Sequence, residues 1–253
     1  MRSLSMRSGN PALNKNTFKN ITHNSDEVMT LDGTVNKTTI SLLILILSAY
    51  YTFSMPIEKS LVFVFPGLIG GFIVALITIF KKHLAPYTVP LYSILEGLAL
   101  GGISAIYNST YTNIVQDAIF ITFGIFCALL FAYKTNFIKA TENFKLGVFA
   151  ATAGIGIVYL INFIMMFFGN GLGIMSLGTP ENPASLMSVG FSVFVVIMAS
   201  LNLVLDFDFI EHGAESGAPK YMEWYGAFGL LVTLVWLYLE ILRLLAKLQS
   251  RRD

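Results

Sequence analysis

Four acidic residues lie inside long apolar stretches of this sequence: Glu96, Asp206, Asp208 and Glu240. A carboxyl group that is kept away from water resists ionisation, so its charge depends on pH. Once deprotonated, it offers the oxygen ligands that a hard cation such as calcium prefers. Ionisable groups in apolar segments are costly, and in membrane proteins they mark functional sites. The four acids therefore predict a proton-sensitive site that handles a cation.

The four acids differ in the charges that lie near them in the sequence. His212 follows Asp208 by four residues, so on a helix the two share a face, and we interpret them as a solvated pair at the membrane surface. Arg243 follows Glu240 by three residues and is its candidate ion-pair partner. The other two acids have no cation nearby, so we expect them to share a polar cavity.

Motifs of known catalytic chemistry are missing from the sequence. Neither HExxH nor GxSxG occurs, and Asp206 sits in VLDFD rather than in the GxGD of intramembrane aspartyl proteases. The glycine-rich segment GNGLG at residues 169–173 lacks the lysine of a phosphate-binding loop, and we interpret it as a flexible connector. We expect no enzymatic activity and no cofactor.

The composition is that of a membrane protein. Of 253 residues, 55% are hydrophobic and 12% are charged, which is about half the charged share of soluble domains. Since a membrane-spanning helix needs roughly 20 apolar residues, the chain has enough for about seven. A net charge of +1 leaves no basic field for nucleic acid. The single cysteine, Cys127, excludes a disulfide within the chain, and its apolar surroundings predict a buried, inert thiol.

Seven apolar stretches recur along the chain and are separated by short polar breaks. They cover residues 38–55, 61–80, 88–107, 114–133, 146–168, 185–210 and 222–245. None alternates as a strand would, so we predict an all-α integral membrane protein with seven transmembrane helices. The chain divides into a polar N-terminal tail (1–37), a seven-helix domain (38–245) and a basic C-terminal tail (246–253).

Lysine and arginine residues in the loops predict the orientation in the membrane. They concentrate in the N-terminal tail and in the second and fourth loops, which places the N-terminus in the cytoplasm. The cations near the C-terminus, Arg243, Lys247, Arg251 and Arg252, favour the cytoplasm too, whereas seven crossings put them outside. Either the last segment is re-entrant or the upstream loops prevail, and we favour seven crossings.

Small residues in two of the stretches predict close helix packing. Gly97 and Gly101 form a GxxxG motif in the third stretch, and residues 150–156 of the fifth contain several alanines and glycines. Such faces allow helix backbones to approach one another closely.

Three segments carry a family resemblance. LNLVLDFDFIEHG closes the sixth stretch at residues 201–213, and KYMEWYGAFGLLVTLVWLYLEILRLLAKL forms the seventh at residues 220–248. Both resemble the transmembrane Bax inhibitor motif family. SGNPAL at residues 8–13 resembles a bacterial branch of that family with a long N-terminal extension. The resemblance implies a location in the bacterial inner membrane and a fold in which six helices surround a central last helix.

The resemblance also implies a pH-sensitive calcium leak, controlled by one acid in each of the last two helices. Asp206 matches the first acid. For the second, the string LYLE selects Glu240, whereas alignment on ILRLL selects Thr233; we take Glu240, because threonine does not titrate. Asp206 and Glu240 would then bind calcium transiently. Glu96 is an acid that the family pattern does not include, and a cluster of Glu96, Asp206 and Glu240 is the alternative arrangement.

Two functions of different classes remain open from the sequence, and a third option, a proton-coupled carrier of another solute, would use the same acids. The first is a calcium-permeable, pH-sensitive leak channel or transporter, whose partners are the lipid bilayer and calcium or another cation. The second is a non-conducting regulator that binds a membrane protein such as a protease. Acids at membrane depth favour the first, because a regulator does not need them.

Overall fold

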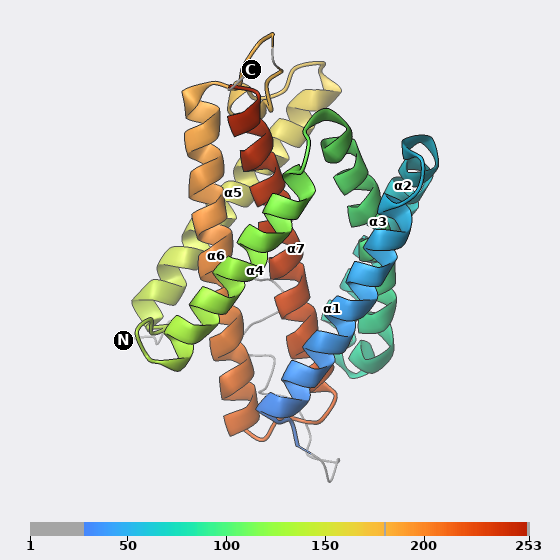
Figure 1. Ribbon diagram of the computed structural model, residues 1–253. Coiled ribbons are helices and arrows are strands. Elements are labelled where there is room, and N and C mark those ends of the chain that lie inside the picture. Colours follow the sequence, from blue (N-terminus) through green and yellow to red (C-terminus); the bar gives the residue numbers. More distant parts are fainter. Residues whose placement is uncertain (1–27, 180, 252–253) are drawn as a thin grey trace. The chain divides into compact units, whose positions relative to one another are not determined.

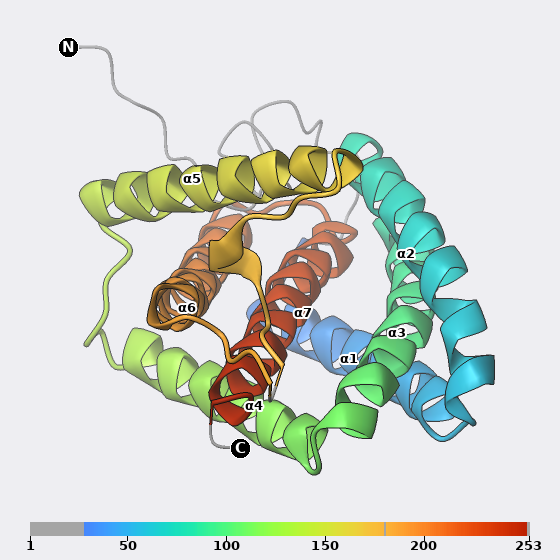
Figure 2. The same cartoon turned by 90° about the horizontal axis from the view of Figure 1, so that it is seen from above.

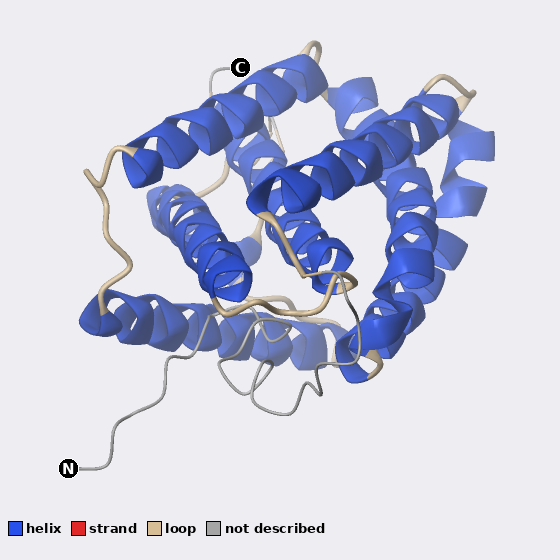
Figure 3. Cartoon of the chain, turned by 90° about the horizontal axis from the view of Figure 1, so that it is seen from below, coloured by secondary structure: helices blue, strands red, loops and turns tan. Residues whose placement is uncertain are grey.

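The computed structural model describes residues 28–179 and 181–251 (Figure 1). Within these residues seven helices are long and apolar enough to cross a membrane. They are α1 (Leu31–Phe53), α2 (Ile57–Phe80), α3 (Ala85–Thr110), α4 (Ile114–Lys134), α5 (Glu142–Phe167), α6 (Leu186–Glu215) and α7 (Met222–Gln249). Two short 3-10 turns, η2 (Lys82–Leu84) and η3 (Gly173–Met175), lie in the connections. The described residues contain no strand, as Figure 3 shows, which confirms the predicted all-α membrane protein.

The first and last helices extend beyond the predicted stretches. Helix α1 begins at Leu31 rather than near residue 38, because Thr30 caps it: Thr30 Oγ1 accepts a hydrogen bond from Gly33 N at 3.0 Å. Helix α7 continues to Gln249, into the segment predicted as a basic tail. Residues 1–27, with the SGNPAL motif, lie outside the described part of the chain.

A buried carboxylate from the start of α7 completes the cap of α1. Glu223 is 0% exposed, and its Oε1 accepts hydrogen bonds from the amide and the hydroxyl of Thr30, both at 3.0 Å. Lys220 Nζ lies 3.0 Å from the same oxygen. The carboxylate rests on Gly33, where any Cβ would overlap it. Glu223 is not among the residues that the sequence singles out, although an acid in the first turn of a helix is a known stabilising pattern.

The described residues form two compact units. The first unit comprises residues 28–110 and Asp206–Val232, and so contains α1, α2, α3, the end of α6 and the start of α7. The second unit comprises Tyr111–Leu205 and residues 233–251, and contains α4, α5 and the remaining parts of α6 and α7. Of the seven spans, α7 has the largest buried share, 61% of its most apolar part.

Small residues let α3 pack closely against both α1 and α2 in the first unit, and Figure 2 shows these helices side by side. Gly97 lies against the backbone oxygen of Leu45, and Gly101 lies against that of Ala49. On the other side of α3, Gly67 of α2 lies against the α3 backbone. A Cβ at Gly67 would be only 2.7 Å from the carbonyl oxygen of Leu95. The packing predicted for the third stretch is therefore confirmed.

The predictions for α5 and for the cysteine are wrong. Gly154 and Gly156 have no atom within 4 Å of the position that a Cβ would take, so no other helix of the described chain packs on them. Cys127 is exposed rather than buried. In a membrane, apolar residues face lipid as readily as protein, so an apolar stretch does not tell which of its sides is buried.

The contrast between these glycines gives a stability test. Gly101→Ala is expected to lower the free energy of unfolding by about 1–3 kcal/mol, because its Cβ would overlap the backbone of α1. Gly154→Ala is the matched control and should not destabilise the protein, because its Cβ meets nothing. Thermal unfolding in detergent measures both. Equal stability of the two variants would contradict the packing of α3 on α1.

Candidate functional site

Glu96 lies in the middle of α3 and faces α2 in the first unit. Its side chain is buried, with 9% of the residue exposed. Its Oε2 lies 2.9 Å from the position that a Cβ of Gly71 would take, so only a glycine leaves room for the carboxyl group there. As predicted for an acid in the middle of a span, Glu96 faces protein rather than lipid.

Asp206 lies in the same unit and is 0% exposed. Its depth follows from the packing of α6 on α7, which a short connection joins as an antiparallel pair. The rings of Phe209 and Tyr225 are 6.4 Å apart between centroids. Asp206 precedes Phe209 by three residues, and Phe228 follows Tyr225 by three, so Asp206 and Phe228 lie at about the same depth.

Helix α3 reaches this depth near Glu96. The ring of Tyr92 contacts the ring of Phe228 with centroids 5.1 Å apart. Glu96 is one helical turn beyond Tyr92, so its carboxyl group and that of Asp206 differ in depth by about one turn, roughly 5 Å. The first unit thus holds two buried acids at similar depth.

A third polar group of the first unit lies at this level. Ser41 of α1 is 0% exposed, and its hydroxyl has no hydrogen-bond partner among the described residues. Leu45 meets Gly97, and α1 and α3 run parallel, so Ser41 lies at the level of Ser93. Ser93, which is also buried, donates its own hydroxyl to Val89 O at 2.9 Å.

Asp208 and His212 form the local pair that their spacing predicts. His212 Nδ1 lies 3.6 Å from Asp208 Oδ2, and the histidine side chain is 46% exposed. The same ring nitrogen is 2.8 Å from the Asp208 carbonyl oxygen. This exposure fits the predicted solvated pair, and no group of three or more metal-binding side chains occurs among the described residues.

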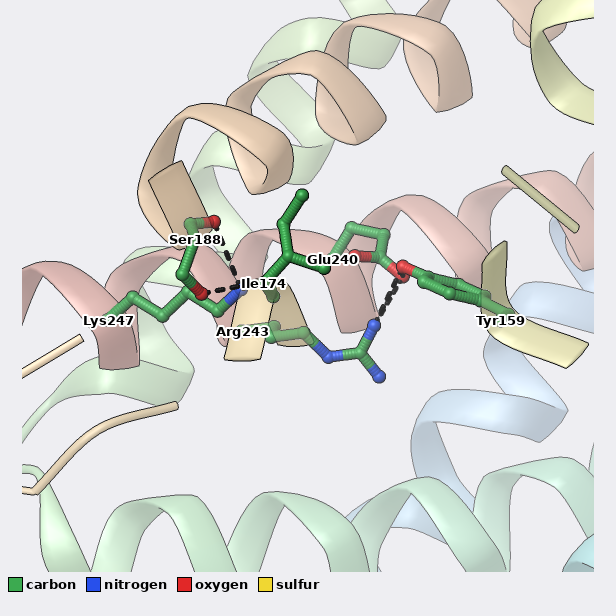
Figure 4. A network of polar contacts seen from close by, with 6 residues as sticks. All are labelled: Tyr159, Ile174, Ser188, Glu240, Arg243 and Lys247. Carbon is green, nitrogen blue, oxygen red and sulfur yellow. Dashed lines mark hydrogen bonds and ion pairs between the residues drawn. The ribbon is translucent and has the colours of Figure 1, made fainter. Parts of the chain in front are cut away.

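Glu240 lies in the second unit and takes part in a closed network of hydrogen bonds (Figure 4). Its Oε1 accepts from Tyr159 OH of α5 at 2.6 Å and from Arg243 NH1 at 2.8 Å. Arg243 NH1 also donates to Tyr159 OH at 2.8 Å. The ion pair with Arg243 confirms the local partner expected from the sequence. Arg243 balances the charge of Glu240, so this acid is a poorer ligand for a cation than an unpaired carboxylate.

Lys247 continues the polar face of α7 beyond Arg243. It is 0% exposed, although the sequence placed it in a basic tail. Its ammonium group donates to Ser188 O at 3.1 Å and to Ile174 O at 3.4 Å (Figure 4). The connection that follows the glycine-rich segment is therefore held in place, because the backbone oxygen of Ile174 accepts a hydrogen bond from α7.

The hydrogen bonds of the C-terminal cations bear on the predicted crossings. Arg243 and Lys247 are bound as described, and Arg251 NH1 donates to Ala184 O at 2.6 Å. Because these cations make hydrogen bonds within the protein, they are weaker evidence for the side of the membrane on which the C-terminus lies. Helix α7 is also uninterrupted over 28 residues, or about 42 Å, which exceeds the roughly 30 Å hydrocarbon core. Both observations favour a full crossing over a re-entrant segment.

The predicted acids thus belong to two places. Glu96 and Asp206 lie in the first unit, whereas Glu240 lies in the second, as does Thr233, the alternative residue for the family position. The transient calcium site of Asp206 and Glu240, and the cluster that adds Glu96, remain predictions.

Comparison with known proteins identifies one family. The family model described as Bax inhibitor 1 like matches residues 10–250, which is nearly the whole chain. No curated protein matches the chain in sequence.

The Glu240 network makes a prediction about stability. Arg243→Met leaves a buried carboxylate without its cation. Breaking a fully buried ion pair costs about 3–5 kcal/mol. Because the Arg243 side chain is 32% exposed, we expect the free energy of unfolding to fall by about 2–3 kcal/mol. Tyr159→Phe should cost about 1 kcal/mol. Chemical unfolding in detergent measures both changes. The double variant Glu240→Leu/Arg243→Met should recover most of the loss, and a fully stable Arg243→Met would refute the ion pair.

Proposed function

The chain belongs to the Bax inhibitor 1 like family, and from this premise we propose that it is a pH-sensitive, calcium-permeable leak channel or transporter. The bacterial inner membrane is its proposed location. The activity is transport rather than catalysis, and the lipid bilayer and calcium, or another cation, are its partners.

The observation that carries this proposal is the pair of buried acids in the first unit. Glu96 and Asp206 are 9% and 0% exposed and lie within about one helical turn of each other in depth. Burial at membrane depth disfavours the charged form of a carboxyl group, and a proton and a hard cation compete for its oxygens. Glu240 contributes less to cation binding, because Arg243 balances its charge.

Protonation provides the proposed control. At low pH both acids are neutral and offer a cation little, so the site is closed to calcium. As the pH rises, the carboxylates ionise and become ligands, and the flux of calcium increases. Asp208, which is paired with His212 near the end of α6, lies outside this mechanism.

Calcium uptake into liposomes that contain the purified protein tests this proposal. The wild type is expected to take up more calcium at neutral than at acidic pH. Asp206→Asn and Glu96→Gln should each lower the flux at neutral pH by about tenfold, which corresponds to roughly 1.4 kcal/mol of lost cation binding, and should flatten the pH response. Asp208→Asn is the control and should keep the wild-type profile. If Asp206→Asn keeps it while Asp208→Asn abolishes it, the wrong aspartate has been chosen.

A specific observation favours the second candidate function, a non-conducting regulator that binds a membrane protein. Gly154 and Gly156 of α5 leave open space beside them, which a transmembrane helix of a partner could use. This function predicts that purified protein carries no calcium flux at any pH, and that the two acid substitutions change nothing measurable in liposomes.

The orientation is a further part of the proposal. We place the N-terminus in the cytoplasm, because the cations of the second and fourth loops are on that side in a seven-span chain. A fluorescent reporter that matures only in the cytoplasm should therefore be bright at the N-terminus and dark at the C-terminus. A phosphatase that is active only outside should give the opposite result. The same result at both ends would show that the number of crossings is even.

A further inference from the structure

Three buried polar atoms of the second unit have no hydrogen-bond partner among the described residues: Asn202 Oδ1, Glu240 Oε2 and the hydroxyl oxygen of Ser192. Glu240 and Ser192 lie toward the same end of the unit, on α7 and α6. Glu240 is 2% exposed and Ser192 is 1% exposed. Buried polar atoms are nearly always hydrogen-bonded, to protein or to ordered water, so each of these atoms needs a partner that is not a protein side chain.

A contact between α6 and α7 places the two residues in one region of the second unit. Lys247 of α7 donates to Ser188 O of α6 at 3.1 Å. Ser192 follows Ser188 by four residues, and Glu240 precedes Lys247 by seven, so each shares a helix face with a residue of that contact. The faces of α6 and α7 that carry Ser192 and Glu240 therefore meet at this end of the unit.

The connection between α5 and α6 covers the nearest end of this unit. Lys247 holds it through Ile174 O at 3.4 Å and fixes it to the start of α6 through Ser188 O at 3.1 Å. Ser250 adds a hydrogen bond to Leu177 O at 3.3 Å. Ser192 is one helical turn inside Ser188, so the two unpartnered atoms begin about one turn below this cover.

We propose that Ser192 and Glu240 form a buried water site that opens toward the α5–α6 connection, with Lys247 as the latch that holds the connection closed. Water fits these atoms because it donates to the carboxylate oxygen and both donates to and accepts from the hydroxyl group. This site is separate from the proposed calcium path, which rests on acids of the first unit.

The charges along this route decide what can follow it. Arg243 balances Glu240, and Lys247 adds a second positive charge nearer the entrance. No acidic residue of α6 lies between 186 and 205 to offset it. The route therefore admits water and repels cations, calcium in particular, whereas a small anion meets less resistance.

Reaction of a cysteine at position 192 tests the proposal without any measurement of flux. Cys127→Ala removes the native thiol, and Ser192→Cys places a new one at the site. The reagent is the anionic sulfonatoethyl methanethiosulfonate, applied to the folded protein in detergent. With Lys247 in place, modification should be slow. Lys247→Met should accelerate it at least tenfold, whereas Lys134→Met, which removes an exposed cation of the same unit, should leave the rate unchanged.

Two further measurements complete the test. In the protein that retains Lys247, the cationic trimethylammonium reagent should react about tenfold more slowly than the anionic one, because the charge of Lys247 is in excess over the balanced pair of Glu240 and Arg243. Ser250→Ala removes one hydrogen bond to the connection and should accelerate modification, though by less than Lys247→Met does. If the Lys247→Met protein does not fold, the modification rate of the Ser250→Ala protein is the test instead. The proposal is overturned if position 192 stays unreactive in the opened variants while the denatured chain reacts, or if the cationic reagent is the faster one.

Discussion

The cost of a polar or charged group in hydrocarbon governs where this chain can place its ionisable residues. Away from water, each such group needs a partner or must give up its charge. Glu240 accepts hydrogen bonds from Tyr159 and Arg243. Lys247 donates to backbone oxygens of the α5–α6 connection and of the start of α6. Glu96 instead lies against a glycine, where the absence of a side chain makes room for it. These different solutions separate groups that stabilise the protein from groups that are available to a ligand.

That separation bears on the proposed calcium site, because a charge-balanced carboxylate is a poorer ligand for a cation. A carboxylate within 2.8 Å of a guanidinium group has its charge balanced before any cation arrives. Glu96 and Asp206 belong to the other unit, and the proposed function gives these two acids, rather than Glu240, the larger part in cation binding.

Local patterns in the sequence predicted what depends on nearby residues. The seven apolar stretches became seven helices, and the spacing of Glu240 and Arg243 predicted their ion pair, because partners three residues apart meet on any helix. The solvated pair at the end of α6 and the close packing of α3 follow from equally local rules.

Contacts between distant segments were not predictable in this way. Lys247 counted as a surface cation, because the backbone oxygens that receive it lie more than 50 positions earlier. Cys127 counted as buried, because an apolar run does not reveal which face meets lipid. The carboxylate that completes the cap of α1 belongs to the last helix, so its contact with Thr30 was not predictable either.

The bond between Thr30 and Glu223 joins positions 193 residues apart. A ribosome delivers the chain from its N-terminus, so the first helix enters the membrane long before the residue that finishes its cap has been made. Until then the amide and hydroxyl groups of Thr30 depend on water or lipid headgroups. The arrival of the last helix therefore completes the structure at its beginning, and a chain that lacks α7 would keep the start of its first helix without this carboxylate.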